Sequence, residues 1–324
     1  EELTKPYFQM ENVRQGVFDL TTKLFGLKYE KLENIPTYHA EVEGFKVMDA
    51  DGSLIGVILT DYFPRSTKRG GAWMNNFVNQ EVVNGVDIRP VIVNVGNFAK
   101  PVDGKPSLLT LDQVETLFHE YGHALHGLLS KCHYKSVAGT SVARDFVELP
   151  SQIMENWAFQ PEVLATYARH YETGEIIPAE LVEKINAAGT FNQGFMTTEL
   201  AAAAMLDLKW HMATTVLTDV EAFEAEACKQ MGLIDEIIPR YRSTYFAHIF
   251  SGGYSAGYYS YLWAEVLDKD AFELFMEKGI LDTETSMSFR RNILEMGGSE
   301  EPMVLYRRFR GADPDPAALV RARG

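Results

Sequence analysis

The most constraining feature of the sequence is an amphipathic segment that predicts one long helix over residues 111–130. Thr110 and Gln113 have the spacing of a capping box, in which the two residues satisfy each other's backbone N–H groups at the start of a helix. Apolar residues then recur every three or four positions, as the buried face of a helix requires: Val114, Leu117, Phe118, Tyr121, Leu125 and Leu128. We therefore expect this helix to lie in the core.

The same helix contains the H-E-x-x-H pattern, as His119-Glu120-Tyr121-Gly122-His123. Residues four apart lie on one helical face, so both imidazoles can reach one metal ion while Glu120 flanks an open coordination position. Gly122 costs a helix interior about 1 kcal/mol relative to alanine, which indicates a functional reason or a close approach at that position. The pattern predicts a catalytic zinc site; a chance grouping of these residues is the alternative.

Catalytic zinc usually has three protein ligands and one exchangeable water, so a third ligand is needed. His126 lies two turns beyond His119, too far along the helix for one tetrahedral ion. Glu148 and Glu155 lie in a second predicted helix, over residues 145–157, where a spacing of seven places both on one face. Carboxylates among apolar neighbours need a positive partner such as a zinc ion, although a solvated acidic face is the alternative. The residues alone do not decide between the two glutamates.

The β-rich part of the chain spans about residues 40–98. Strands are predicted over 42–47 and 54–62, and the Asp51-Gly52 step between them is a strong hairpin signal. A third strand is predicted over 91–95, where β-branched residues alternate.

Helical patterns account for most of the remaining sequence, above all over residues 110–324. The apolar run 200–208, interrupted by Asp207, predicts a buried helix. The predicted fold class is mainly α with a small antiparallel β-sheet, as a zincin-type catalytic region around the H-E-x-x-H helix. No repeat or linker divides the chain, so 1–324 is expected to form a single region. A further helix is predicted near the start, where apolar residues recur after Asn12: Val13, Val17, Leu20 and Leu24.

Charge and cysteine usage exclude several classes of protein. The chain has 45 acidic and 30 basic residues and a formal net charge of -15, so nucleic acid, which attracts clustered Lys and Arg, is not an expected partner. No stretch is apolar enough for a membrane span. Cys132 and Cys228 lack a CxxC spacing and are expected to be free thiols in the core. The cytoplasm is the expected compartment, with the periplasm as the alternative.

Two segments, 118–126 and 145–152, resemble the signature of the thimet oligopeptidase family, which includes oligopeptidase A and the bacterial peptidyl-dipeptidases. In that family the third zinc ligand is a glutamate 25 residues after the second histidine, which corresponds to Glu148 here. The resemblance implies one zinc ion per chain, with His119, His123 and Glu148 as ligands and Glu120 as general base. It also implies that Glu155 is a carboxylate that orients a ligand histidine.

A further block, residues 246–263, resembles the glycine- and tyrosine-rich loop of that family. Adjacent glycines permit a mobile turn, and phenols can donate hydrogen bonds to a developing oxyanion, although core packing is the alternative for any one tyrosine. By resemblance, Tyr254 and Tyr261 stabilise the tetrahedral intermediate, His248 assists, and Tyr258 contacts the substrate.

The resemblance continues over residues 5–8, 69–74 and 89–94, so it covers essentially the whole chain. It implies hydrolysis of peptide bonds in short peptides, either as a peptidyl-dipeptidase or as an oligopeptidase. Segments such as 140–146 and 167–171 resemble the peptidyl-dipeptidases more closely.

Members of the family also have an N-terminal, largely helical half that forms the other wall of a deep channel. The helical pattern at the start of the chain indicates a beginning inside a longer protein, so the expected partners are short peptides and this missing N-terminal half. Two alternatives remain. One is a fragment that binds zinc and peptides without turnover, and the other is a structural helical domain with an accidental motif.

Overall fold

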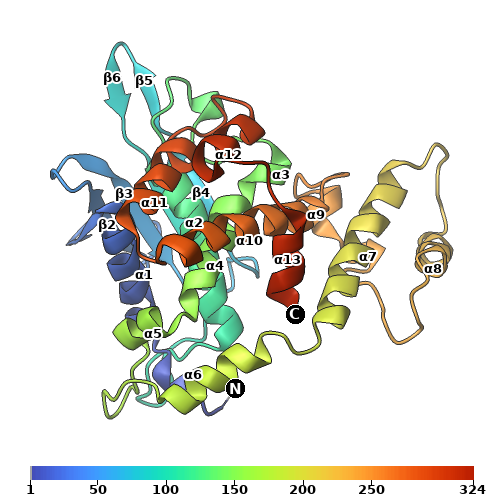
Figure 1. Cartoon of the computed structure of the whole chain (residues 1–324), viewed down its shortest axis with the longest axis horizontal. Coiled ribbons are helices and arrows are strands. Elements are labelled where there is room, and N and C mark those ends of the chain that lie inside the picture. The colour runs from blue at the N-terminus through green and yellow to red at the C-terminus, as the bar shows by residue number, and fades with distance from the viewer. Residues whose placement is uncertain (1) are drawn as a thin grey trace.

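A long central helix organises the fold. The computed structural model describes residues 2–324, and in it α2 (Leu111–Leu128) packs against a sheet on one side and against helices on the other (Figure 1). The side chain of Thr110 accepts the N–H of Gln113 at 3.2 Å, and the side chain of Gln113 accepts the N–H of Thr110 at 3.1 Å. The predicted capping box and helix are therefore confirmed, with an end slightly before residue 130.

The other α-helices surround α2 or follow it along the chain. They are α1 (Met10–Phe25), α3 (Arg144–Val147), α4 (Leu149–Ala158), α5 (Pro161–Tyr167), α6 (Ala179–Ala188), α7 (Gln193–His211), α8 (Val220–Gln230), α9 (Ala247–Phe250), α10 (Ser260–Lys278), α11 (Thr283–Phe289), α12 (Pro302–Arg310) and α13 (Pro316–Arg323). The predicted N-terminal helix is α1. Short 3-10 turns occur at Lys5–Tyr7, Lys135–Val137 and Ser243–Tyr245, and a π-helical turn occurs at Arg290–Leu294.

The strands form one five-stranded sheet, in the order β1-β2-β3-β7-β4, and one separate hairpin of β5 and β6. Their bounds are β1 (Lys28–Leu32), β2 (Glu43–Met48), β3 (Leu54–Asp61), β4 (Trp73–Val78), β5 (Glu81–Val83), β6 (Val86–Ile88) and β7 (Val91–Val95). Strands β3 and β7 run parallel, whereas the other neighbours in the sheet run antiparallel. The sheet is thus mixed, where an antiparallel one was expected, because β7 lies between β3 and β4 and runs parallel to β3.

The three predicted strands correspond closely to β2, β3 and β7. The turn between β2 and β3 is the expected one: Gly52 has a φ of +88° and donates its N–H to the carbonyl of Asp49 at 2.9 Å. Strands β1, β4, β5 and β6 were not predicted. Two of these, β5 and β6, have three residues each, and β4 contains two asparagines, which are uncommon in strands.

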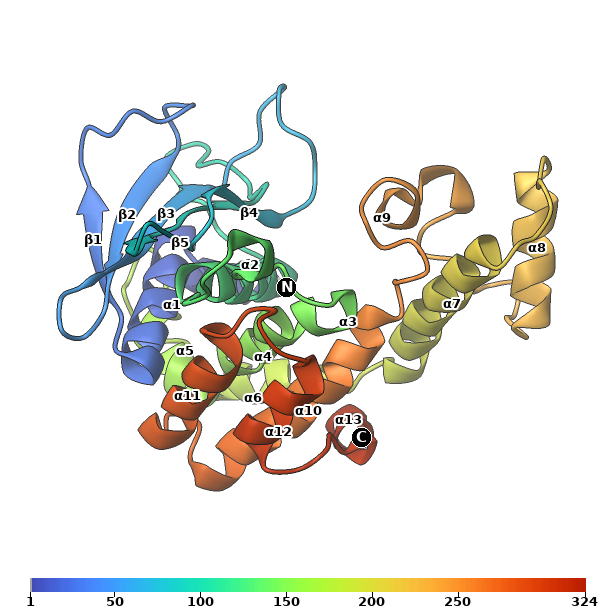
Figure 2. The same cartoon turned by 90° about the horizontal axis from the view of Figure 1, so that it is seen from above.

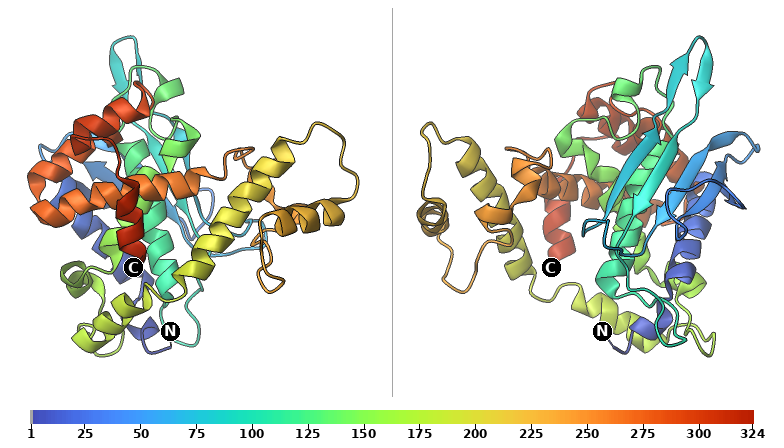
Figure 3. Two further views of the ribbon diagram at one scale, coloured as in Figure 1. Left: turned by 45° about the vertical axis from the view of Figure 1, so that its right-hand side comes forward. Right: turned by 180° about the vertical axis from the view of Figure 1, so that it is seen from behind.

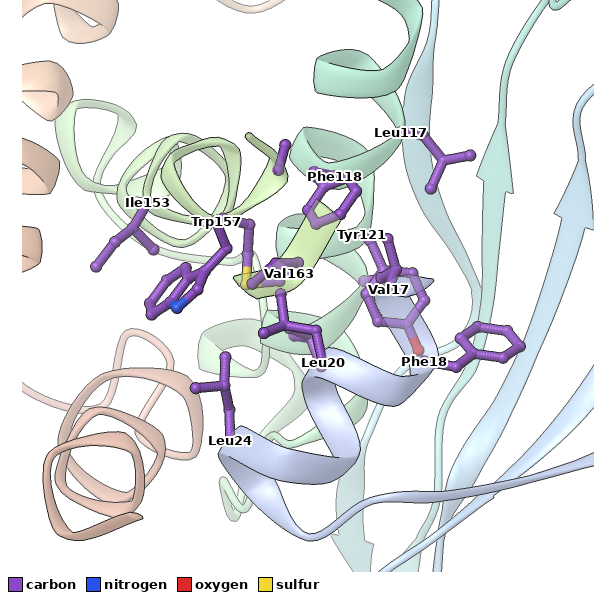
Figure 4. Close-up of a cluster of buried hydrophobic side chains, with 14 of the residues drawn as sticks. Val17, Phe18, Leu20, Leu24, Leu117, Phe118, Tyr121, Ile153, Trp157 and Val163 are labelled. Carbon is purple, nitrogen blue, oxygen red and sulfur yellow. The ribbon is translucent and has the colours of Figure 1, made fainter. Parts of the chain in front are cut away.

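One large apolar core lies between α1, α2 and the helices that follow them. Figure 4 shows side chains from α1, α2, α4 and α5 pointing into this cluster. Among them, Tyr121 and Trp157 are fully buried and among the largest side chains of the core. The core thus fixes α2 and α4 against each other, and these two helices carry the candidate metal ligands.

Helices α7 and α8 form an arm that extends away from the body (Figures 1, 2 and 3). The predicted buried run 200–208 lies in α7, but only one face is buried, because Met205 in its middle is 46% exposed. A second, smaller apolar cluster joins α7 to the segment around α9: Ala203, Ala204, Phe246, Ile249 and Tyr258.

Both cysteines are free, as expected, but only Cys132 is buried; Cys228 is partly exposed on α8. Over residues 2–324 we find no helix whose length and apolar character would let it cross a membrane.

Candidate active site

Three side chains converge beside α2. Nε2 of His123 lies 3.1 Å from Oε2 of Glu148, and Nε2 of His119 lies 3.4 Å from the same oxygen. One ligand atom from each residue lies within 4.8 Å of the others, so the group could hold a metal ion. Two imidazoles and one carboxylate are a donor set typical of catalytic zinc. His126 lies outside this group, fully buried, and burial lowers its pKa to about 3.

Glu148 reaches the histidines from a break between two helices. The predicted helix over 145–157 is divided there: α3 ends at Val147 and α4 begins at Leu149, with Glu148 between them. Pro150 has no N–H to donate, so it suits the first turn of a new helix. The break therefore places the carboxylate of Glu148 at the start of α4.

Gly122 allows α4 to approach α2 closely at this point. A Cβ atom at position 122 would lie 2.1 Å from the carbonyl oxygen of Pro150 and 2.5 Å from Cα of Ser151. Such distances are far below van der Waals contact. The glycine within the motif thus has a packing reason, and this contact between helices brings Glu148 beside the histidines.

Glu155, one of the two glutamates left open by spacing alone, contacts the other side of His119. Its Oε1 lies 2.5 Å from Nδ1 of His119, so Nε2 points toward Glu148. A carboxylate on the second ring nitrogen fixes the orientation of a ligand histidine. Burial by itself would lower the pKa of His119, but the bonds with Glu148 and Glu155 raise it well above its usual value.

Glu120 lies next to this group with its carboxylate largely shielded from solvent. The residue is 8% exposed, and within the described part of the chain its Oε2 has no hydrogen-bond partner. Burial raises the pKa of this carboxyl, which suits a group that must accept and release a proton near neutral pH. The amide of Asn94 on β7 donates to the backbone carbonyl of Glu120 at 2.9 Å, so the sheet supports the motif helix directly.

The tyrosine loop, residues 251–259 between α9 and α10, lies against the same group, as does Tyr261 in the first turn of α10. The Tyr254 hydroxyl donates to Oε1 of Glu148, and the Tyr254 ring stacks on Tyr261 at 5.2 Å between centroids. Burial raises the pKa of both phenols, so both keep their protons at neutral pH and can donate hydrogen bonds. His248 also lines the cleft, and burial lowers its pKa. Tyr258 is only 5% exposed and packs in the smaller apolar cluster, so a contact with substrate would require the loop to move.

A cleft of about 660 Å³ lies over this site, and its lining includes the candidate ligands together with Glu120, Tyr254 and Tyr261. Sequence reasoning missed two cations in it: Arg69, whose guanidinium lies 4.5 Å from the Trp73 ring centroid, and Arg144, at 4.5 Å from the Tyr254 ring centroid. Both arginines lie in segments that the sequence distinguishes only by their resemblance to the family. The Gly70-Gly71 step beside Arg69 was the available signal, because adjacent glycines often border a site.

Comparisons with known proteins agree with this geometry. The model of peptidase family M3 matches residues 1–324. The dipeptidyl carboxypeptidase of Escherichia coli strain K12 is 45% identical over 328 residues, and oligopeptidase A of Salmonella typhimurium is 40% identical over 328 residues. Each alignment covers 100% of this chain and 48% of the relative, so the chain spans about half the length of these curated relatives.

Solved structures of low sequence identity share the fold. A carboxypeptidase from Pyrococcus furiosus superposes with a TM-score of 0.57 at 15% identity, covering 98% of this chain and 59% of that one. The M32 carboxypeptidase from Deinococcus radiodurans gives 0.55 at 13% identity, with the same coverage of 98% and 59%. The match along its whole length establishes that the chain belongs to peptidase family M3, as its motifs predicted.

Proposed function

We propose that this chain carries the catalytic centre of a zinc-dependent peptidase that hydrolyses peptide bonds in short peptides. The observation that carries the proposal is the convergence of His119, His123 and Glu148 on one point of the cleft, in a chain that belongs to a peptidase family. The geometry suits one ion, because the three ligand atoms lie within 4.8 Å of one another. Three protein ligands would leave one position of a tetrahedral zinc ion for water or substrate, as catalytic zinc requires.

The residues around this point have complementary roles. A bound zinc ion supplies Lewis acidity, which polarises a carbonyl and acidifies water. Glu120 accepts the proton of the attacking water and passes it to the leaving amine. Tyr261, and Tyr254 once its hydroxyl turns from Glu148, donate hydrogen bonds to the oxyanion that develops on the scissile carbonyl, with His248 assisting. Glu155 holds His119 in the orientation that the metal needs.

Within this function we favour release of C-terminal dipeptides. Identity to the E. coli dipeptidyl carboxypeptidase is 45%, against 40% to oligopeptidase A. Arg69 and Arg144 also line the cleft without an ion-pair partner in residues 2–324, although the chain is acidic overall. Unpaired guanidinium groups suit the free carboxylate at the end of a peptide.

Mass spectrometry of the products distinguishes the two subtypes. A set of peptides of increasing length is offered with a free C-terminus and again with an amidated one. A peptidyl-dipeptidase shortens the free peptides by two residues at a time and spares the amidated ones. Internal cuts that ignore amidation would instead favour the oligopeptidase subtype.

The alternative of a binding fragment without turnover is supported by the 48% coverage of the relatives. Hydrolysis of a short fluorogenic peptide is compared between this chain and the whole protein, each loaded with zinc. Turnover by the whole protein alone would favour the alternative for the isolated chain, and turnover by both would exclude it.

A further inference from the structure

A buried aspartate on the arm holds the backbone of the tyrosine loop. Asp207 on α7 is 0% exposed, and its carboxylate accepts two loop amides, with Oδ1 at 2.9 Å from the N of Ala256 and Oδ2 at 2.8 Å from the N of Tyr258. Nδ1 of His211, one turn further along α7, lies 2.7 Å from Oδ1. The aspartate that interrupts the apolar run therefore has polar partners for both carboxylate oxygens, in the loop and in one histidine.

The loop needs such an acceptor because its conformation is irregular. Ala256 has a φ of +53°, a left-handed conformation that is strained for a residue other than glycine. Regular secondary structure offers no carbonyl to the amides of Ala256 and Tyr258. Tyr258 is buried, and a buried N–H group requires a partner. The bonds to Asp207 supply that partner and hold Ala256 in its strained conformation.

The same loop reaches the candidate metal ligands. Its backbone is fixed to α7 by Asp207, and its apolar side packs on Ala203 and Ala204 of the same helix. At its other side, the hydroxyl of Tyr254 donates to Glu148. Figure 2 shows α7 and α9 on the same side of the molecule, where the smaller apolar cluster joins them. The position of the tyrosines is therefore set by the arm as well as by the body.

We propose that Asp207 is a positioning residue for the reaction: it fixes the backbone of the loop so that Tyr254 and Tyr261 point at the scissile carbonyl. This inference rests on the proposed function, because Asp207 acts only through the tyrosines. Asp207→Asn tests it well, since the new amide nitrogen cannot accept an N–H. Glu224→Gln is a matched control, because Glu224 is also a buried carboxylate of the arm and accepts the backbone N–H of Ser243 at 2.6 Å, away from the tyrosine loop.

The first measurement is hydrogen exchange of the whole, zinc-loaded protein, followed by mass spectrometry of peptides that cover residues 250–262. Asp207→Asn should speed exchange in these peptides, leave those of α2 and α4 unchanged and leave the zinc content unchanged. Glu224→Gln should speed exchange near Ser243 instead. Unchanged exchange over 250–262 in Asp207→Asn would refute the proposal, and this result holds even for a protein without peptidase activity.

The second measurement is a double-mutant cycle on peptide hydrolysis. Asp207→Asn should lower kcat by about tenfold to a hundredfold with little change in KM, since a displacement of about 1 Å can cost on the order of a hundredfold in rate. In the Tyr261→Phe background most of this loss should vanish, because the aspartate acts through the tyrosines. Rate losses that simply multiply, or an equal loss of kcat in Glu224→Gln, would show a general effect of arm stability and overturn the proposal. A wild-type protein that binds zinc but cleaves no peptide would refute the proposed function, whereas the exchange result would still decide whether Asp207 holds the loop.

Discussion

At the scale of single residues, a substitution at Tyr261 tests whether its hydroxyl acts in catalysis or serves only in packing. If its hydroxyl donates to the oxyanion, Tyr261→Phe should lower kcat by about a hundredfold to a thousandfold with little change in KM. Tyr306→Phe is the control, because the Tyr306 hydroxyl is buried in the main core and donates to Asp270 at 2.6 Å. This control should lower the melting temperature and leave kcat unchanged. The same behaviour in Tyr261→Phe would favour the packing role.

The sequence allowed some site residues to be predicted from local spacing and others only by resemblance. His119 and His123 follow from helical periodicity, because residues four apart share a face. Glu148 could not be separated from Glu155 in this way, since the choice depends on how α4 packs against α2. In the sequence pattern Asp207 is only an interruption of an apolar run. Its hydrogen-bond partners could not be predicted, because they lie 49 and 51 residues further along the chain.

At the scale of elements, the contact between α2 and α4 determines the site. Gly122→Ala should lower the free energy of unfolding by roughly 1–3 kcal/mol, because the new methyl group would overlap the backbone of Pro150 and Ser151. Gly194→Ala on α7 is the control, since a Cβ there has no atom within 4 Å; it should be neutral or stabilising by up to about 1 kcal/mol. Chemical denaturation measures both. A neutral Gly122→Ala would mean that α4 can shift without cost.

Elements with strong periodicity were predictable and weakly patterned ones were not. The capping box and apolar stripe specify α2, and the Asp-Gly turn specifies the β2–β3 hairpin. The parallel pairing of β3 with β7 depends on the tertiary structure, and the sequence of neither strand specifies it alone. The break at Glu148 depends on Pro150. The pattern around this proline is otherwise helical, so it predicts one continuous helix where the structure has two.

At the scale of the whole molecule, Arg290 connects distant parts of the chain. It is 2% exposed, and its Nη1 donates to the carbonyl of Phe25 at 2.8 Å and to Oδ1 of Asp49 at 3.0 Å. Its hydrogen bonds hold the pKa of Asp49 below the ordinary value of 3.8. A depressed folded-state pKa means that this stabilisation is complete above that value and is lost as the pH falls through the folded-state pKa.

Asp49→Asn should therefore lower the free energy of unfolding by about 1.5–3 kcal/mol at neutral pH. The difference from wild type should stay constant from about pH 8 to about pH 5 and shrink below about pH 4. Asp313→Asn, which removes an exposed pair with Arg307, should cost about 0–1 kcal/mol. Denaturant titrations across this pH range measure these differences, and a cost of Asp49→Asn that grows on acidification would contradict the assignment.

Apolar side chains are exposed at the end of α7, in the connection to α8 and in the segment after α8. Met212 is 75% exposed, Val216 90% and Ile238 62%. The chain should bind a hydrophobic dye, because exposed apolar side chains that lie close together attract such dyes. Ile238→Ser should reduce the dye binding. Equal dye binding by Ile238→Ser and wild type would contradict this expectation.

His119, His123 and Glu148 are proposed to hold a catalytic zinc ion, with Glu120 as the base. Metal content and peptide hydrolysis are measured together on the whole protein and on two variants. Wild type should contain one zinc per chain; His123→Ala should lose it. Glu120→Gln should keep zinc but hydrolyse peptides about a hundredfold to ten-thousandfold more slowly. Folded wild type without zinc, or Glu120→Gln that loses zinc as His123→Ala does, would contradict the account.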